Sequence, residues 1–379
     1  MPEFVQSIAS QQLPTPLYLP GVKIHSFMIE MSMDVVQRYC DKYFNLGNPR
    51  DRDFVYKPVP LFPYATLMVL EYPVMVAADR TPLPTNSVPF YERGYMSQNE
   101  VFLGVPVMRH GTSMGNFLRN VAVQFAYPFM VVDNATSTAS GREILGFPKL
   151  PAEITLTEGV WPGSLAANVK MFGWPSLDPE CLQELMPFLS VTTGPKLPYV
   201  GPSAEVSSVW SLGANGYLRK GMEAFAAGYD MLDQLTCGLI PSPLHVVALK
   251  QFRQAERPHE AVYQAIIDAK PRYYNVRDLQ FYNEQDVDIT FFDRGSFDGL
   301  IREFLDPPPN ESPIKSKIQH IEVAAKMACS FTADIDYTGM FTIHSFTEPR
   351  HRNRGGGSLP VNDMISPWLR PWQGFWDLS

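Results

Sequence analysis

Apolar runs rich in Val, Phe, Tyr and Met recur along the chain and are typical of strands. They fall at 65–77, 100–109, 121–133, 244–252, 261–269, 272–283, 286–292, 325–335 and 340–346. The segment 152–172 around Pro162-Gly163 predicts a hairpin, and Asp336 to Gly339 predicts a turn that joins the last two runs. The connections are short and no strand–helix–strand alternation occurs. The pattern therefore predicts an α+β fold, mainly β, with a closed or highly curved antiparallel sheet.

Helical patterns are fewer. Met33 to Phe44 places apolar residues at helical spacing, with Asp34 and Gln37 placed as a capping pair. The start signature Asp178-Pro179-Glu180 predicts a short helix through Phe188, and 205–235 is helical in pattern but interrupted by glycines. We expect a few helices attached to the sheet.

Both ends of the chain differ from its middle. Residues 1–22 are polar and proline-punctuated, which predicts an extended lead-in. Residues 350–379 form a Gly-linked tail with three of the six tryptophans, Trp368, Trp372 and Trp376. One interpretation docks these rings on the protein's own body or on a neighbouring subunit, and another makes the tail a lid over a ligand pocket. We expect a homo-oligomer.

Composition narrows the class of protein. Hydrophobic residues make up 45% and charged residues 18% of the 379 residues, which excludes disorder for most of the chain. The 35 prolines exclude a helical bundle or coiled coil. A net charge of −8 argues against nucleic acid as a partner.

The compartment is expected to be the cytoplasm. The N-terminal segment has neither the basic region nor the apolar core of a signal peptide. The most apolar stretch, 65–78, is interrupted by Glu71 and Pro73 and is too short to span a bilayer, so no membrane partner is expected. Four cysteines, far apart in the chain, fit a reducing environment.

Motifs for cofactors are absent from the sequence. There is no Gly-x-Gly-x-x-Gly and no phosphate-binding Gly-x-x-x-x-Gly-Lys-Ser/Thr. The seven histidines include no His-x-His or His-x-x-x-His pair. We expect neither a cofactor nor a metal.

The segment whose residues are best suited to catalysis is Gly141-Arg-Glu-Ile-Leu-Gly-Phe-Pro-Lys149-Leu-Pro151. Four apolar neighbours, two of them prolines, surround Lys149. Burial lowers the pKa of a lysine, and a neutral amine is what a Schiff-base nucleophile requires. The alternative is a lysine with an apolar stem in the protein and a charged head in water.

The string GREILGFPK resembles the signature around the reactive lysine of the acetoacetate decarboxylase family. A second match is Glu100-Val-Phe-Leu-Gly-Val-Pro-Val107, which is similar to the family strand that carries a glutamate six residues before Pro-Val. Weaker matches are 242–252, similar to a later Leu-Lys strand, and 325–346, similar to the closing hairpin. The resemblance implies a curved antiparallel β-barrel that encloses a pocket. It implies one domain over 23–349, with insertions near 78–98, 173–235 and 293–324.

The same resemblance implies site residues. Lys149 occupies the Schiff-base position and Glu100 that of a pocket glutamate, which would orient the lysine or relay protons. Alternatively, Glu100 is a strand-end carboxylate paired with Arg142 or another cation. Arg142 and Glu143 are expected to hold the loop through hydrogen bonds. Two further residues, Phe147 and Leu150, are expected to support the substrate pocket.

This sequence departs from the family pattern at two positions. Family decarboxylases often carry a second lysine directly after the reactive one, where this chain has Leu150. They also carry an arginine in the first strand, where the region His25 to Met31 offers only His25. Desolvation would therefore have to activate Lys149.

Three functions follow as hypotheses. The first is a Schiff-base lyase on a small-molecule carbonyl or keto-acid substrate, most simply the decarboxylation of a β-keto acid. An aldolase-dehydratase or another lyase on a larger carbonyl compound is the alternative reaction. The second hypothesis is a non-catalytic barrel that binds an apolar small molecule, and the third is an assembly protein whose tail packs between subunits.

Overall fold

The computed structural model describes residues 13, 15–60, 62–77, 95–112, 121–159, 163–176, 178–196, 245–292, 304–305 and 320–346. All of them belong to one compact unit, Met1–Phe346. The expected helix 205–235, much of the three insertions and the Trp-rich tail lie outside the described residues and stay predictions.

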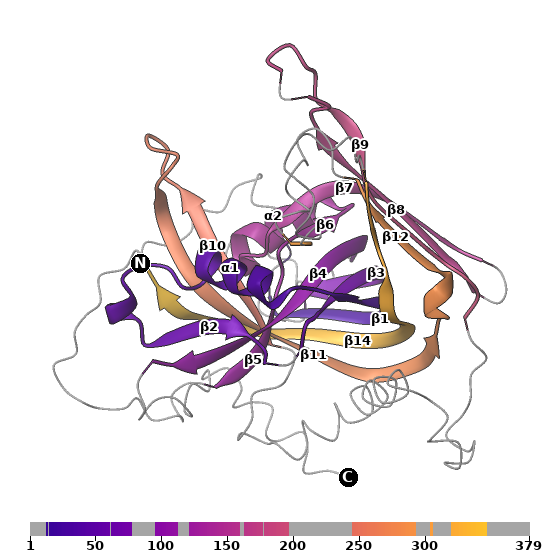
Figure 1. Ribbon diagram of the computed structural model, residues 1–379, viewed down its shortest axis with the longest axis horizontal. Helices are drawn as coiled ribbons and strands as arrows, with labels where there is room; N and C mark the ends of the chain where they lie inside the picture. Colours follow the sequence, from indigo (N-terminus) through magenta and orange to yellow (C-terminus); the bar gives the residue numbers. More distant parts are fainter. Residues whose placement is uncertain are drawn as a thin grey trace, which may run out of the picture. The chain divides into compact units, whose positions relative to one another are not determined.

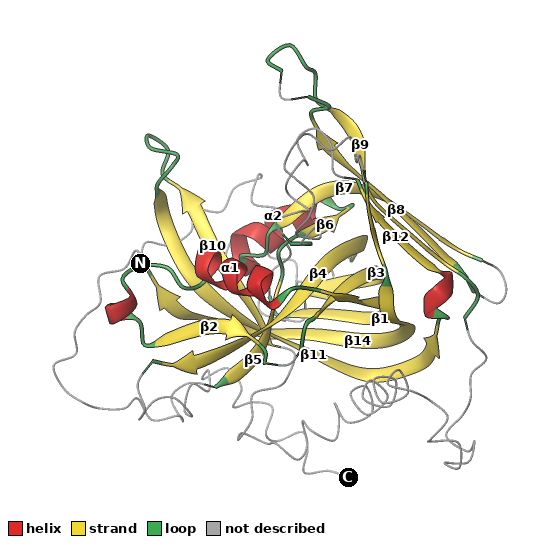
Figure 2. Cartoon of the chain, viewed as in Figure 1, coloured by secondary structure: helices red, strands yellow, loops and turns green. Residues whose placement is uncertain are grey.

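Strands dominate the described residues, and helices are few and short (Figure 2). The strands are β1 (Leu17–Glu30), β2 (Phe54–Pro58), β3 (Tyr64–Ala77), β4 (Met96–Gly111), β5 (Ala122–Ala126), β6 (Met130–Val132), β7 (Lys149–Glu158), β8 (Leu165–Gly173), β9 (Glu184–Thr193), β10 (His245–Arg253), β11 (Ala261–Phe281), β12 (Val287–Phe291), β13 (Ile321–Val323) and β14 (Ala325–Ser345). The helices are α1 (Met33–Tyr43) and α2 (Ala135–Ser140), with short helical turns at Pro49–Asp51, Gly141–Leu145 and Glu284–Asp286. The mainly β fold class predicted from the sequence is confirmed.

Seven strands close into a ring of hydrogen bonds, in the order β4-β3-β1-β14-β11-β10-β5 and back to β4 (Figure 1). A second series leaves the ring at β4 and runs β6-β7-β8-β9-β12-β13. Strand β4 serves both, because residues 105–109 pair with β5 and residues 100–102 pair with β6. The neighbours are antiparallel except for β5–β10 and β6–β7, which are parallel, so the expected antiparallel sheet is in fact mixed.

The two largest hydrophobic cores lie on opposite faces of the central strands. Because successive side chains of a strand alternate, Val69 and Val101 join the first core, whereas Leu70 and Phe102 join the second. The first core also takes side chains from α1, β7, β8, β9 and β12. The second takes side chains from every strand of the ring.

Helix α1 forms where its periodicity predicts. Its buried side chains, Val35, Val36, Tyr39 and Cys40, recur at helical spacing and pack into the first core. The expected capping pair is not formed. Ser32 occupies the N-cap, and the Gln37 amide donates instead to Asp41 Oδ1 at 3.0 Å.

The helix predicted from Asp178 to Phe188 is wrong. The backbone N–H of Glu180 donates to Asp178 Oδ1 at 3.0 Å, so the start signature makes only a turn. Residues 184–193 then form β9, in which Met186, Phe188 and Val191 are buried. Pairing with both β8 and β12 outweighs the local helix signal.

Strand boundaries differ from the sequence pattern at several places. The expected turn at 336–339 is wrong, because β14 continues through it to Ser345, and so the last two runs are one strand rather than a hairpin. The runs 261–269 and 272–283 likewise merge into β11. Neighbours explain this: β14 lies between β1 and β11, which pair with it on both edges. Conversely, the run 121–133 splits into β5 and β6, and β1 begins at Leu17, inside the expected lead-in.

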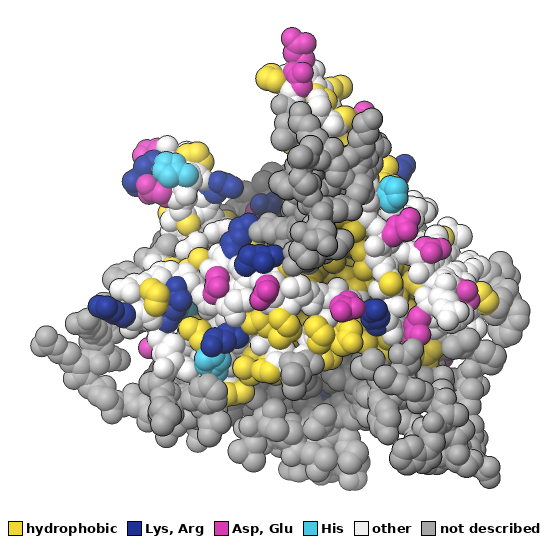
Figure 3. Space-filling model, in the orientation of Figure 1, with side chains coloured by type: hydrophobic (Ala, Val, Ile, Leu, Met, Phe, Trp, Pro, Cys, Tyr) yellow, Lys and Arg dark blue, Asp and Glu magenta, His cyan; other side chains and the backbone are white. Residues whose placement is uncertain are grey.

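On the face shown in Figure 3, positive and negative side chains of the described residues are interspersed. No helix in the described part of the chain is long and apolar enough to cross a membrane.

Candidate active site

Lys149 and Glu100 form a buried ion pair. Lys149 is the first residue of β7 and lies opposite Met130 of β6, while Glu100 on β4 lies opposite Val132 of the same strand. The short strand β6 therefore separates the two. Lys149 is 5% exposed and Glu100 4% exposed, and Lys149 Nζ lies 2.7 Å from Glu100 Oε2. Two expected site residues, 49 positions apart in the sequence, thus meet in the structure.

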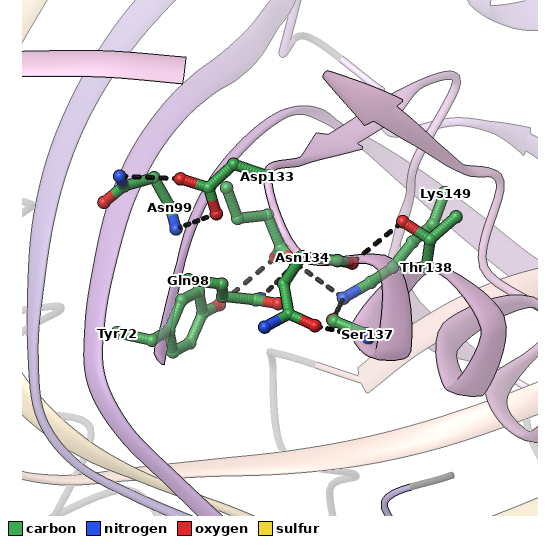
Figure 4. Close-up of polar contacts among 9 residues, drawn as sticks. Tyr72, Gln98, Asn99, Asp133, Asn134, Ser137, Thr138 and Lys149 are labelled. Atoms are coloured by element: carbon green, nitrogen blue, oxygen red, sulfur yellow. Dashed lines mark hydrogen bonds and ion pairs between the residues drawn. The ribbon is translucent and has the colours of Figure 1, made fainter. Parts of the chain in front are cut away.

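The Glu100 carboxylate has two further hydrogen-bond donors. The Tyr72 hydroxyl donates to Oε1 at 3.2 Å, and the Gln98 amide nitrogen donates to Oε2 at 2.9 Å (Figure 4). Burial raises the pKa of Tyr72 well above its ordinary value, and the charge of Glu100 adds to the effect. The phenol therefore stays protonated and remains a donor.

The Lys149 amine also donates to Ser137 Oγ at 3.0 Å. Ser137 is held by the start of α2, where the Asn134 side chain caps the helix by accepting from the Ser137 backbone N–H at 3.0 Å. The amide nitrogen of Asn134 in turn donates to the backbone oxygen of Ser97 at 3.1 Å. This chain of contacts anchors α2 to β4 beside Glu100.

Two glycines of the motif allow close approaches that other residues would prevent. Helix α2 continues into a π-helical turn, Gly141–Leu145. A Cβ on Gly141 would lie 2.8 Å from Lys149 Cε and 3.0 Å from Lys149 Cγ. Gly146 has φ +70°, and a Cβ there would lie 2.5 Å from the Cβ of Lys250 on β10. The first glycine makes room for the lysine side chain, and the second makes room for the neighbouring strand.

The turn is joined to β10 and closed on itself by hydrogen bonds. Lys250 Nζ donates to the backbone oxygen of Ile144 at 3.2 Å. The Phe147 backbone N–H donates to the Gly141 oxygen at 2.9 Å. Burial lowers the pKa of Lys250, and the charge of Glu143 opposes the shift.

The other expected site residues are not among the described hydrogen-bond partners of the Lys149 amine. Phe147 is buried in the second core, with its ring 5.7 Å from that of Tyr127 in an edge arrangement. Arg142 and Glu143 are exposed, and their expected role in holding the loop stays a prediction. The cation that pairs with Glu100 is Lys149 rather than Arg142. Leu150 packs against the first core, on the other face of the sheet.

His25 does not stand in for the missing first-strand arginine. It is buried, with Nδ1 2.7 Å from the Tyr282 hydroxyl and Nε2 3.3 Å from Glu158 Oε1. His25 is not among the described hydrogen-bond partners of Lys149, which are Glu100 and Ser137.

Sequence reasoning missed Tyr72, Gln98 and Ser137. Gln98 lies two residues before Glu100, outside the expected strand 100–109, and it shares the face of Glu100 because β4 begins earlier, at Met96. Ser137 follows Asn134 by three residues, which is the spacing of a helix cap. Tyr72 had no such local signal, because only the pairing of β3 with β4 brings it near Glu100. Within the described ranges, no cluster of three or more His, Cys, Asp or Glu is placed to hold a metal.

Comparison with known proteins supports the resemblance. A sequence model of the family described as acetoacetate decarboxylase (ADC) matches residues 2–174, a range that contains Glu100, Ser137 and Lys149. The resemblance to this family is confirmed over that part of the chain. No curated protein matches the sequence significantly.

Several solved structures are distantly similar. The acetoacetate decarboxylase of Legionella pneumophila subsp. pneumophila str. Philadelphia 1 is 12% identical, with 92% of this chain and 100% of that chain covered and a TM-score of 0.47. A second acetoacetate decarboxylase structure is also 12% identical, covering 91% and 97% with a TM-score of 0.49. The enduracididine biosynthesis enzyme MppR, complexed with the condensation product of pyruvate and imidazole 4-carboxaldehyde, is 11% identical, covering 88% and 92% with a TM-score of 0.47.

Proposed function

We propose that this chain, acetoacetate decarboxylase-like over residues 2–174, is a lyase that forms a Schiff base between Lys149 and a carbonyl substrate. The observation that carries the proposal is the buried contact of 2.7 Å between Lys149 Nζ and Glu100 Oε2, with the lysine in a motif similar to the family's reactive-lysine signature. A lysine that serves only stability would more simply keep its head in water.

Glu100 is suited to manage the protons of imine formation. It accepts a proton from the Lys149 ammonium, and the neutral amine then attacks the carbonyl carbon to form a C–N bond. The proton that leaves the nitrogen passes to the former carbonyl oxygen. Glu100 returns its own proton as the C–O bond breaks, so that water and an iminium ion form. The hydroxyl of Ser137 holds the nitrogen in place, and that of Tyr72 holds Oε1.

The iminium ion accepts the electron pair of the bond that breaks next. With a β-keto acid, the bond to the carboxylate breaks, CO₂ leaves and an enamine remains. Protonation of the enamine at carbon and hydrolysis by water release the ketone and restore the lysine. Loss of an α-proton instead of CO₂ would begin an aldolase-dehydratase reaction on the same iminium. We place decarboxylation first and keep the aldolase-dehydratase as the alternative.

Borohydride trapping tests the proposal. Hydride reduces an iminium to a stable secondary amine, so incubation with a panel of β-keto acids and borohydride should add a fixed mass to the chain. Peptide mapping should place that mass on Lys149. If no keto acid in the panel gives an adduct, the proposed Schiff base is refuted.

A matched pair of variants separates a specific adduct from general lysine chemistry. Lys149→Met should abolish trapping. Lys170→Met should leave it unchanged, because Lys170 lies on β8 with a side chain that is 48% exposed and pairs with Glu153 on the surface. Equal loss in both variants would contradict the assignment to Lys149.

A non-catalytic role is the second candidate. It is favoured by the aromatic side chains of the second core around the site, among them Tyr72, Phe102, Tyr127 and Phe147. This reading predicts that Lys149→Ala retains its affinity for an apolar ligand such as a fluorescent naphthalene sulfonate. Loss of that binding together with trapping would favour the enzyme.

A further inference from the structure

Gln98 carries an unused acceptor beside the reactive pair. Its side chain is 4% exposed, and its amide nitrogen donates to Glu100 Oε2 at 2.9 Å. Its amide oxygen, Oε1, is buried and has no hydrogen-bond partner among the described residues. The amide cannot simply be turned around, because Oε1 would then face the carboxylate of Glu100 and two acceptors would meet.

The amide group that carries this acceptor lies close to the amine of Lys149. The Gln98 amide nitrogen and Lys149 Nζ both donate to Glu100 Oε2, at 2.9 Å and 2.7 Å, so they are no further apart than these two distances together. Figure 4 shows Gln98 and Tyr72 approaching from one side and Lys149 and Ser137 from the other. A small carbonyl compound joined to the Lys149 nitrogen would extend beside the Gln98 amide.

A buried acceptor without a partner is unfavourable, and nearly all such groups in folded proteins are paired. We infer that Gln98 Oε1 accepts a hydrogen bond from the substrate. The substrate would then be a carbonyl compound with a donor, a hydroxyl or an amide N–H, within a few bonds of the carbonyl carbon. This inference rests on the proposed function and adds the class of substrate to it.

The chemistry of the amide oxygen makes the inference selective. An ionised carboxylate or an ether oxygen offers Oε1 no proton, so neither can replace the donor. A methyl group in place of the donor would leave Oε1 buried and unpaired. Gln98 is therefore a specificity-determining residue that discriminates hydroxylated substrates from plain ketones.

Three small ketones test this directly. Hydroxyacetone, butan-2-one and methoxyacetone differ at one substituent beside the carbonyl: a hydroxyl, a methyl group and an ether that accepts but cannot donate. Each trapping rate on Lys149 with cyanoborohydride is divided by the rate of the same ketone with a free alkylamine. We expect the normalised rate of hydroxyacetone to be about tenfold higher than that of either of the others, because one hydrogen bond to a buried acceptor is worth about that much. Equal normalised rates for hydroxyacetone and methoxyacetone would overturn the inference.

The variant Gln98→Met tests whether the preference for hydroxyacetone comes from Gln98. It removes both amide atoms, but loss of the bond to Glu100 affects all three ketones alike, so the ratio of rates isolates Oε1. The ratio should fall to about one. Gln251→Met is the matched control, since Gln251 is an exposed glutamine of β10, and it should keep the wild-type ratio.

The outcomes separate the two proposals. If no ketone or keto acid is trapped on the wild-type chain, the Schiff-base function fails. If all three ketones are trapped and the wild-type ratio persists in Gln98→Met, the Schiff base stands and the role of Gln98 is refuted. The three-ketone comparison on the wild-type chain needs no variant, so it decides the matter even if Gln98→Met does not fold.

Discussion

The position of the Lys149 side chain depends on the residues beside its methylene chain as much as on those beside its amine. Gly141 leaves the space that the chain occupies, while Glu100 and Ser137 hold the nitrogen at its end. A single methyl group on Gly141 would meet three carbons of the lysine side chain. The glycine in the sequence motif is therefore as necessary to the position of the amine as the carboxylate.

Gly141→Ala should lower the rate of borohydride trapping at Lys149 by at least about tenfold, because the new Cβ displaces the side chain from Glu100. Intact-mass kinetics measure this. Gly47→Ala is the control: Gly47 has φ +73° with open space around its Cβ position, so that variant costs stability without touching the site. Equal trapping in Gly141→Ala and wild type would show that the lysine reaches its place by another route.

The effects of removing Glu100 and Lys149 on the free energy of unfolding should be coupled. Glu100→Gln leaves a buried ammonium without its counter-charge, and Lys149→Met leaves a buried carboxylate without its own. The double variant removes both charges. We expect it to be more stable than the sum of the single effects implies, by about 1 to 3 kcal/mol in urea denaturation. Strict additivity would mean that the two charges do not interact in the folded protein.

At the scale of elements, α2 and its π-helical turn act as the frame of the site. The Asn134 cap sets the start of α2 and with it the position of Ser137, and Gly146 together with Lys250 fixes the end of the turn against β10. Strand β7 begins with Lys149, three residues after Gly146. Together, α2, the π-helical turn and the start of β7 place the amine of Lys149 beside the buried carboxylate of Glu100.

Two capping asparagines allow a matched test of this frame. Asn134→Ala and Asn48→Ala each remove a side chain that caps a helical segment, and each should lower stability by about 0.5 to 2 kcal/mol. Trapping at Lys149 should fall only in Asn134→Ala, because that cap alone positions Ser137. Similar trapping in the two variants would mean that Ser137 is held by the rest of α2.

The sequence predicted Glu100 and Lys149 better than it predicted α2, the helix that lies between them in the chain. Lys149 and Glu100 are both carried by motifs, and Glu100 also begins an expected strand, so their roles could be proposed before they were seen to meet. The helix between them, α2, went unpredicted because Ala-Thr-Ser-Thr-Ala-Ser has no apolar periodicity. Helix 178–188 and the turn at 336–339 were wrong for a related reason: local signals there are overruled by pairing with strands distant in the sequence, β12 for β9 and β11 for β14.

Across the whole described unit, the contacts of one carboxylate help to tie the second strand series back to the ring. Glu158 is the last residue of β7, and it contacts His25 and Lys23 on β1. The hydrogen bond from His25 lowers the pKa of Glu158 to about 2, against an opposing effect of burial, and the positive charge of Lys23 helps. Strand β1 lies in the ring, so this carboxylate links the two strand systems.

A carboxyl group with a lowered folded-state pKa contributes stability above its unfolded value of 4.5 and loses it as the pH falls toward 2. Glu158→Gln should therefore be less stable than wild type at pH 7, by no more than about 1 kcal/mol because the side chain is partly exposed to screening solvent. The difference should vanish as the pH approaches 2. Urea denaturation at several pH values measures it, and a constant difference down to pH 2 would contradict the link.

The ring has a consequence for how the protein is made. Its strand β1 begins at Leu17 and pairs with β14, which ends at Ser345, so the two edges that join lie far apart in the sequence. During synthesis on the ribosome, β1 has its partner β3 early, but β14 begins only at Ala325, 295 positions after β1 ends at Glu30. Until then its free edge is open to pairing with other chains. We therefore expect slow closure, late in translation, and a nascent chain that depends on chaperones until its last strand is made.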